Sequence, residues 1–164
     1  MNDMPNYRKI LRLLVEKNVE TVVIGAVAMI FRSSTYATED IDICYKQSTE
    51  NAERICRALA PVCPAIRSAF TDTMDLLATN PRGGNFKTDL GDIDLLVEVV
   101  GLGNYDTVSQ YATLVTLEDI TVQALTLDGL IKAKEAAGRS KDLVHLITLR
   151  ALKEMEDKEV DAEE

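Results

Sequence analysis

Two short acidic motifs are the parts of this sequence whose spacing could support chemistry. Asp40 and Asp42 occur in a Glu-Asp-Ile-Asp-Ile segment. Asp92 and Asp94 occur in a later Gly-Asp-Ile-Asp-Leu segment. Alternate residues of a β-strand point to one face, so each motif predicts two carboxylates on one side and apolar residues on the other. Carboxylate oxygens suit Mg²⁺, which also takes phosphate oxygens and water, so we predict a cation-phosphate site.

The alternative for each motif is a solvated strand face, and for an isolated Asp-x-Asp pair that alternative is the commoner one. Two observations favour a cation site. Two separate strands carry such pairs, and like charges gathered on one face are unfavourable unless a cation is present. Gly25 also lies fifteen residues before Asp40 and is followed by helix formers. Backbone N–H groups at such a turn suit a triphosphate.

The order of apolar patterns predicts one domain of the α/β (α+β) class that ends in helices. In the last helix, Leu143, Leu146, Ile147 and Leu149 are expected to face inward. Strands are expected at 21–24, 39–45, 85–89, 92–99, 113–117 and 120–125, and helices at about 3–18, 26–31, 49–60, 72–78, 105–111, 126–137 and from 140 onward.

Length and charge set the limits of this domain. The chain has 164 residues and a net charge of −9. Residues 1–152 are expected to form the domain, and 153–164, with seven acids and two lysines, an acidic C-terminal tail that frays. The rest is then only mildly acidic, which disfavours a broad basic face for nucleic acid.

Cysteine content and the lack of long apolar runs predict a cytoplasmic protein with no membrane partner. Cys44, Cys56 and Cys63 show no Cys-x-x-Cys spacing and accompany a single histidine, so buried thiols are expected rather than disulfides or a zinc site. No apolar run reaches membrane-spanning length, and the first residues lack the pattern of a signal peptide.

The motifs, in their order along the chain, resemble a known family. The stretches 25–28 (Gly-Ala-Val-Ala), 38–43 (Thr-Glu-Asp-Ile-Asp-Ile) and 91–96 (Gly-Asp-Ile-Asp-Leu-Leu) resemble the minimal nucleotidyltransferases of the DNA polymerase β-like superfamily. The stretches 127–134 and 138–143 are similar to the C-terminal helices of bacterial members related to abortive-infection and toxin–antitoxin nucleotidyltransferases. The resemblance therefore extends over roughly residues 20 to 150. It implies the nucleotidyltransferase fold, with a mixed β-sheet, helices packed behind it and C-terminal helices.

The resemblance also implies a role for particular residues. Asp40 and Asp42 match the family's metal-binding pair. Asp94 matches its third carboxylate, which also helps to deprotonate an acceptor hydroxyl. Gly25 matches the first position of a turn that contacts the triphosphate, and Ala26 stands where the family usually has Gly or Ser. These residues form the implied catalytic and metal site.

Lys134 and Arg139 match basic positions near the phosphates in the same family. The implied reaction is Mg²⁺- or Mn²⁺-dependent transfer of a nucleoside monophosphate from a nucleoside triphosphate, such as ATP, to a hydroxyl of RNA, protein or a small molecule. A cognate antitoxin is a further protein partner that the resemblance suggests. Relatives commonly carry Arg at the position of Tyr36. This difference, together with Ala26, favours the alternative of a catalytically inactive nucleotide-binding or protein-interaction module.

Several assignments stay open on the sequence alone. Asp92 either joins the metal site or serves the turn at Gly91, and the turn is favoured. Lys134 and Arg139 either contact phosphate or form a pair at a helix end. His145 is either a base or, more commonly for such a position, a solvated side chain. A third possibility for the whole chain is an interaction protein whose aspartates form a solvated face.

Overall fold

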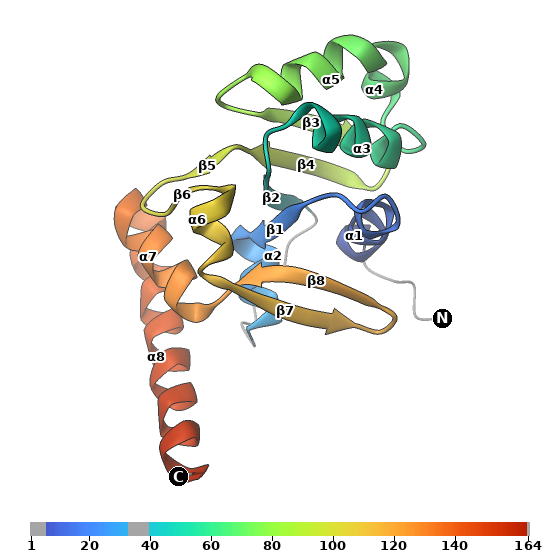
Figure 1. The fold of residues 1–164 in the computed structure, drawn as a ribbon. Coiled ribbons are helices and arrows are strands. Elements are labelled where there is room, and N and C mark those ends of the chain that lie inside the picture. Colours follow the sequence, from blue (N-terminus) through green and yellow to red (C-terminus); the bar gives the residue numbers. More distant parts are fainter. Residues whose placement is uncertain (1–5, 33–39, 164) are drawn as a thin grey trace.

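A six-stranded mixed sheet organises the part of the chain that the computed structural model describes, residues 6–32 and 40–163. The strand order is β3-β4-β2-β1-β8-β7, and β5 and β6 form a separate two-stranded ribbon (Figure 1). Strands β2 and β4 are parallel, as are β1 and β8, while the other neighbours are antiparallel. The predicted α+β architecture is confirmed.

The first third of the chain supplies two central strands and their connecting helices. Its predicted strands and helices are confirmed, although Asp3, Tyr36 and residues 38–39 lie outside the described residues. The Ser48 hydroxyl caps α3 by accepting a hydrogen bond from the Asn51 backbone N–H (3.1 Å). The elements are α1 (Asn6–Glu16), β1 (Thr21–Ile24), α2 (Gly25–Phe31), β2 (Ile41–Tyr45) and α3 (Thr49–Leu59).

The middle of the chain adds one edge of the sheet. The predicted antiparallel pair around Leu90-Gly91 is confirmed, but the second strand ends at Leu96 and the chain then enters the small ribbon. A five-residue helix opened by Pro64 was not predicted. The elements are α4 (Pro64–Ser68), α5 (Phe70–Thr79), β3 (Gly84–Thr88), β4 (Gly91–Leu96), β5 (Glu98–Val99), β6 (Gly103–Asn104) and α6 (Tyr105–Ser109).

The last third closes the other edge and ends in two helices. Strands β7 (Ala112–Leu117) and β8 (Ile120–Leu125) form the predicted hairpin, followed by α7 (Leu127–Ala137) and α8 (Ser140–Glu163). The segment from residue 153, which was expected to fray, continues α8 as helix to Glu163. Although α8 has 24 residues, the part of the chain that is described contains no helix with both the length and the apolar content to cross a membrane.

The inward face of α8 differs from the expected one. Leu146 and Leu149 are buried, as predicted. Leu143 and Ile147 are 59% and 72% exposed, so their assignment to the inner stripe was wrong. The helix carries apolar residues around much of its circumference near its start, and periodicity alone does not show which of these stripes meets the body of the protein.

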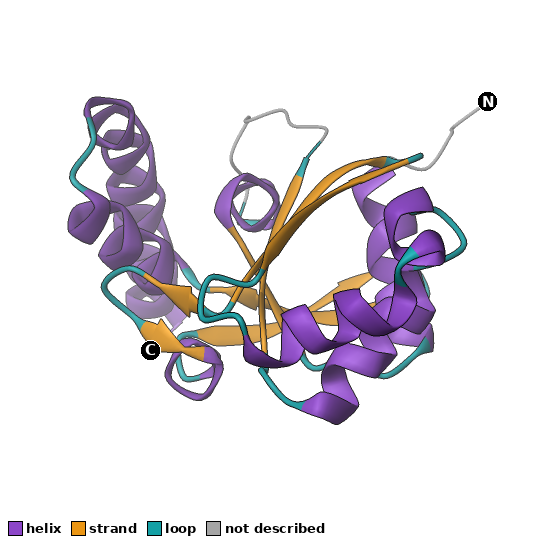
Figure 2. Cartoon of the chain, turned by 90° about the horizontal axis from the view of Figure 1, so that it is seen from above, coloured by secondary structure: helices purple, strands orange, loops and turns teal. Residues whose placement is uncertain are grey.

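The two faces of strand β2 serve different purposes. Ile41, Ile43 and Tyr45 are fully buried, and the Tyr45 hydroxyl donates a hydrogen bond to the Leu77 carbonyl of α5 (2.6 Å). Asp42 points to the other face, because side chains alternate along a strand. Figure 2 shows α3 and α5 on one side of the sheet and α2 on the opposite side. The sheet therefore has an apolar face towards α3 and α5, and a face carrying Asp42 towards α2.

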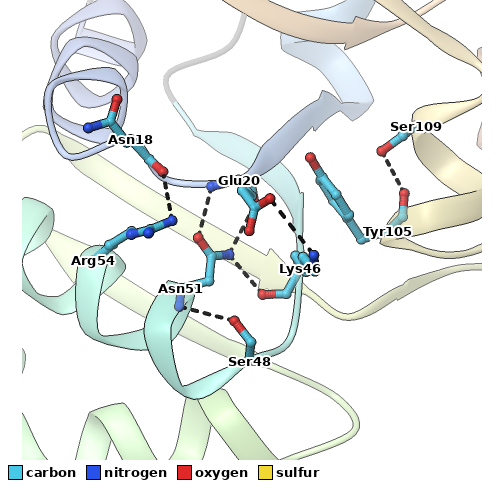
Figure 3. Close-up of polar contacts among 8 residues, drawn as sticks. All are labelled: Asn18, Glu20, Lys46, Ser48, Asn51, Arg54, Tyr105 and Ser109. Carbon is cyan, nitrogen blue, oxygen red and sulfur yellow. Dashed lines mark hydrogen bonds and ion pairs between the residues drawn. The ribbon is translucent and has the colours of Figure 1, made fainter.

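A buried asparagine fixes α3 to the sheet (Figure 3). Asn51 is fully buried, and its side-chain oxygen accepts a hydrogen bond from the Glu20 backbone N–H (2.8 Å). Its side-chain amide donates to the carbonyls of Glu20 (3.1 Å) and Lys46 (2.8 Å). These bonds join the start of β1 and the end of β2 to the first turn of α3, so the antiparallel β1–β2 pair and α3 hold one another in place.

All three cysteines of the chain, Cys44, Cys56 and Cys63, are buried free thiols, as expected. Burial raises the pKa of Cys44 to about 12. Burial, with a smaller contribution from Cys63, raises the pKa of Cys56 to about 11. Neutral thiols of this kind behave as small apolar core residues.

Candidate functional site

Asp42 and Asp94 lie directly opposite each other on the adjacent parallel strands β2 and β4. Both side chains are half-buried. Burial raises the pKa of Asp42, and the charges of Asp94 and Asp40 raise it further. Burial also raises the pKa of Asp94. Two partly desolvated carboxylates in this arrangement repel each other when ionised, and a bound cation would remove that repulsion.

The turn at Gly25 brings the start of α2 against this carboxylate pair. Strand β1 ends at Ile24, and Gly25 begins α2 directly with a positive φ of 64°. A Cβ atom at Gly25 would lie 2.5 Å from Asp42 Oδ2, so only glycine permits this approach. The preceding residue, Ile24, has no polar side chain with which to cap the first backbone N–H groups of the helix.

Two cations held by one buried carboxylate form the opposite wall. The Asp142 side chain is fully buried, and Arg139 Nε donates a hydrogen bond to its Oδ2 atom (2.8 Å). Lys134 Nζ donates to Oδ1 (3.2 Å). The hydrogen bonds from Arg139 and then Lys134 hold the pKa of Asp142 well below its ordinary value. One carboxylate thus positions two cations at the junction between α7 and α8.

These groups line one pocket of about 450 Å³. Carboxylates lie on the strand side, while Lys134 comes from α7, Lys141 from α8 and Arg139 from the turn between these helices. Lys134 and Lys141 partly offset the rise in the pKa of Asp42, so the two walls interact electrostatically. Six of the seven predicted site residues line this pocket: Gly25, Ala26, Asp42, Asp94, Lys134 and Arg139.

Asp40, the seventh predicted residue, does not line the pocket, although its charge acts on Asp42. It precedes the first residue of β2 and is exposed, whereas the sequence predicted it on the strand beside Asp42. Its Oδ1 atom accepts a hydrogen bond from the Asp92 backbone N–H (3.3 Å). Among residues 6–32 and 40–163, no three acidic, histidine or cysteine side chains gather as a ready-made metal site. The three-aspartate metal set therefore stays a prediction.

Sequence reasoning gave no role in the site to Lys141 or Asp142, and it favoured a solvated side chain for His145. Lys141 and His145 line the pocket. Asp142 lies outside the pocket lining and forms ion pairs with Lys134 and Arg139, which do line it. Burial, followed by the charge of Lys134, lowers the pKa of His145 and favours its neutral form. The spacing of Lys141 and His145, four residues apart on one helix, was the available signal, since such residues share a face.

A second, mostly apolar pocket of about 470 Å³ adjoins the first. The two share Gly25, Lys134 and Arg139 in their walls. The remaining wall of the second pocket is contributed mainly by aliphatic side chains from the β5–β6 ribbon and α7, including Val99, Val100, Leu130, Ala133 and Ala136. The combined space therefore has a charged compartment and an apolar one.

The mixed sheet, with paired carboxylates on its central strands beside a glycine turn, has the nucleotidyltransferase-like fold. A solved structure shares this fold: that of TM1012 from Thermotoga maritima, described as a candidate nucleotidyltransferase. The similarity covers 90% of this chain and 94% of that chain, with a TM-score of 0.58 and 16% sequence identity. At this identity the likeness establishes the fold alone. No protein-family model matches the chain. No curated protein matches it either.

Proposed function

We propose that this chain is a nucleotidyltransferase that moves a nucleoside monophosphate from a nucleoside triphosphate to a hydroxyl acceptor. The observation that carries the proposal is the pocket in which Asp42 and Asp94 face Lys134, Arg139 and Lys141. Carboxylates on one wall suit a divalent cation, and cations on the other suit phosphate oxygens. A metal-bound triphosphate would place its cation against the carboxylate wall and its phosphate oxygens against the cationic wall.

The donor atoms fit Mg²⁺ or Mn²⁺. Asp42 and Asp94 offer hard carboxylate oxygens from neighbouring strands, and triphosphate oxygens and water would supply most other ligands. Asp40, exposed at the start of β2, is the third carboxylate that we assign to the site. When bound, the cation would neutralise charge on the phosphate oxygens and favour in-line displacement.

Other groups of the pocket would bind the phosphates and accept the proton of the acceptor. Backbone N–H groups at Gly25 and Ala26, together with Lys134 and Arg139, bind the phosphates that leave as pyrophosphate. The acceptor oxygen forms a bond to the α-phosphorus, and the bond between that phosphorus and the bridging oxygen breaks. We assign the acceptor's proton to an Asp94 carboxylate oxygen, because Asp94 lies beside Asp42 in the pocket where the acceptor would attack.

The adjoining apolar pocket is the place that we assign to the nucleobase. Aliphatic side chains such as Val99, Leu130 and Ala133 can cover the faces of a flat ring. The shared wall at Gly25, Lys134 and Arg139 keeps this ring next to the triphosphate compartment. The acceptor can be RNA, protein or a small molecule, and membership of a toxin–antitoxin pair with a cognate antitoxin rests on the sequence resemblance.

A second candidate is a catalytically inactive nucleotide-binding module with the same fold. Two observations favour it: Ala26 provides no hydroxyl beside the phosphates, and Asp40 does not line the pocket. Such a module would bind a nucleoside triphosphate without turning it over. The two candidates therefore share a binding site and differ in transfer.

The test is a thermal-shift titration with each nucleoside triphosphate and with inorganic tripolyphosphate, with and without Mg²⁺. A ligand that binds only the folded state raises its melting temperature. We expect a Mg²⁺-dependent rise for tripolyphosphate and a larger one for at least one nucleoside triphosphate. Both rises should be lost in Asp42→Asn and kept in Asp75→Asn, which alters an exposed carboxylate on α5.

The same experiment separates the parts of the proposal. Equal rises with tripolyphosphate and every nucleoside triphosphate would contradict the nucleobase assignment and leave the phosphate site intact. No rise with any of these ligands would contradict the proposed function. Transfer itself is then measured with an α-labelled nucleoside triphosphate, where release of pyrophosphate with labelled nucleoside monophosphate and no labelled acceptor would indicate hydrolysis instead of transfer.

A further inference from the structure

Helix α8 exposes an apolar stripe on the side facing away from the body of the protein. Leu143, Val144, Ile147 and Met155 are 59%, 66%, 72% and 60% exposed, and Ala151 is exposed between them. The buried side chains of the same helix, Asp142, Leu146 and Leu149, occupy the opposite side. Contiguous exposed apolar residues of this kind mark an interaction surface.

The stripe forms a regular ridge. Leu143, Ile147, Ala151 and Met155 follow one another at intervals of four residues. Side chains spaced four residues apart form a ridge, and such a ridge can pack into the groove between two ridges of a facing helix, with nearly antiparallel axes when that groove lies between i±3 rows. The midpoint of this ridge lies near Leu149. In an antiparallel pair centred there, Leu143 would lie opposite Met155 of the second copy, and Ile147 opposite its small Ala151.

The charges of α8 favour the same antiparallel orientation. Its first part, together with the preceding Arg139, carries four cationic side chains and one carboxylate, the buried Asp142. Arg139, Arg150 and Lys153 also form ion pairs within the chain, so the complementarity rests on the overall charge of each part and on Lys141. Its last part, residues 154–163, carries six carboxylates and one lysine. An antiparallel pair places the cationic part of each helix towards the acidic part of the other, whereas a parallel pair brings the two acidic parts together.

The length of α8 leaves it available for such a partner. A helix of 24 residues is about 36 Å long, and α7, with 11 residues, is about 16 Å long. The second half of α8 therefore extends beyond α7, and Figure 1 shows it projecting away from the sheet. A two-fold contact uses the same patch on both copies, which the apolar ridge and the charge order both satisfy.

We propose that the exposed face of α8 is the contact surface of a symmetric homodimer in which two α8 helices pack antiparallel. The contact centres on the ridge Leu143, Ile147, Ala151 and Met155. It does not depend on the proposed enzymatic function. Because the ridge faces away from the α7–α8 junction, substitutions in it alter association without removing core contacts.

The first test is sedimentation velocity over a range of protein concentrations. We expect a dimer for the unaltered chain and a monomer for Ile147→Glu, because a buried unpaired carboxylate is unfavourable. Leu114→Glu is the matched control, since Leu114 is 70% exposed on strand β7 and lies outside the ridge. A chain that stays monomeric at every concentration, or an Ile147→Glu variant that still dimerises, would overturn the proposal.

The second test determines orientation by disulfide cross-linking. A mixture of Leu143→Cys and Met155→Cys chains should form the mixed cross-linked dimer, since these positions meet across the antiparallel ridge. The Leu143→Cys chain alone should form little cross-link. Efficient cross-linking of Leu143→Cys with itself would instead identify a parallel pair and overturn the antiparallel assignment. The native cysteines are fully buried and do not compete.

Discussion

Asp42 Oδ2 occupies the space that a side chain at residue 25 would need, and Gly25 leaves that space open. The two residues come from different strand ends, yet a Cβ at position 25 would lie 2.5 Å from that oxygen. Glycine is favoured at this position for two reasons: the close approach of Asp42 Oδ2, and a φ of 64°, which residues with a side chain rarely adopt. The backbone turn and the carboxylate are therefore parts of one arrangement.

The Gly25→Ala variant tests this arrangement. It should lower the free energy of unfolding by about 2–3 kcal/mol, of which about 1 kcal/mol is the strain of a positive φ. Gly138→Ala is the control, because Gly138 has a φ of 61° and the nearest atom to its added Cβ is 3.8 Å away. Urea denaturation of both variants should show the larger loss for Gly25→Ala. Equal losses would mean that the contact with Asp42 contributes nothing.

The Asp42→Asn variant should separate stability from ligand binding. Removing one of two facing carboxylates relieves repulsion, so the metal-free protein should gain up to about 1 kcal/mol of unfolding free energy. The same change should abolish stabilisation by Mg²⁺ with nucleoside triphosphate. Calorimetry with and without ligand measures both effects. A variant that loses stability without ligand would show that Asp42 has a structural role in the apo protein.

The Asp142→Asn variant should destabilise the α7–α8 junction by about 2–3 kcal/mol, because it leaves Lys134 and Arg139 without their shared carboxylate. The lowered pKa of Asp142 also gives a pH signature. A carboxylate with a depressed pKa stabilises the fold fully above its ordinary value of about 4, and that stabilisation is lost as the pH falls below it.

Denaturation at a series of pH values checks this signature. Between about pH 5 and pH 3, the unaltered chain should lose more stability than Asp142→Asn, so the difference between them should shrink as the pH falls. Asp75→Asn, at an exposed site, should follow the unaltered chain. A constant difference across this range would contradict the ionised, ion-paired state of Asp142.

The Asn51→Leu variant should lose about 3 kcal/mol or more of unfolding free energy, because it leaves the Glu20 N–H and the carbonyls of Glu20 and Lys46 without their buried partner. Asn85→Leu, on the exposed part of edge strand β3, should change stability little. Urea denaturation measures both. Binding of nucleoside triphosphate to folded Asn51→Leu should be unchanged, since Asn51 does not line the pocket.

The sequence was sufficient for the parts of the site that depend on local patterns. Alternation along β2 and β4 placed Asp42 and Asp94 on the strand face away from the core, and helix formers after Gly25 located the turn. It did not identify Asp142 as a buried anion, because burial depends on how α7 and α8 meet. The error over Leu143 and Ile147 has the same origin, since two apolar stripes on one helix compete for the core.

The position of Asp40 shows another limit. Strand periodicity placed it beside Asp42, but strand pairing begins only at Ile41, opposite Ile93. A residue just before a strand is free of the alternation that holds within it. The residues preceding Asp40 lie outside the described part of the chain.

The buried cysteines make local opening of the folded structure measurable by the rate of thiol labelling. Cys44 and Cys56 lie on different elements, β2 and α3, and both have raised thiol pKa values. A thiol reagent can reach them only when the surrounding structure opens, so labelling rates under native conditions measure how often each region does so. Comparison of the two rates would show whether β2, which carries Asp42, opens together with α3 or separately.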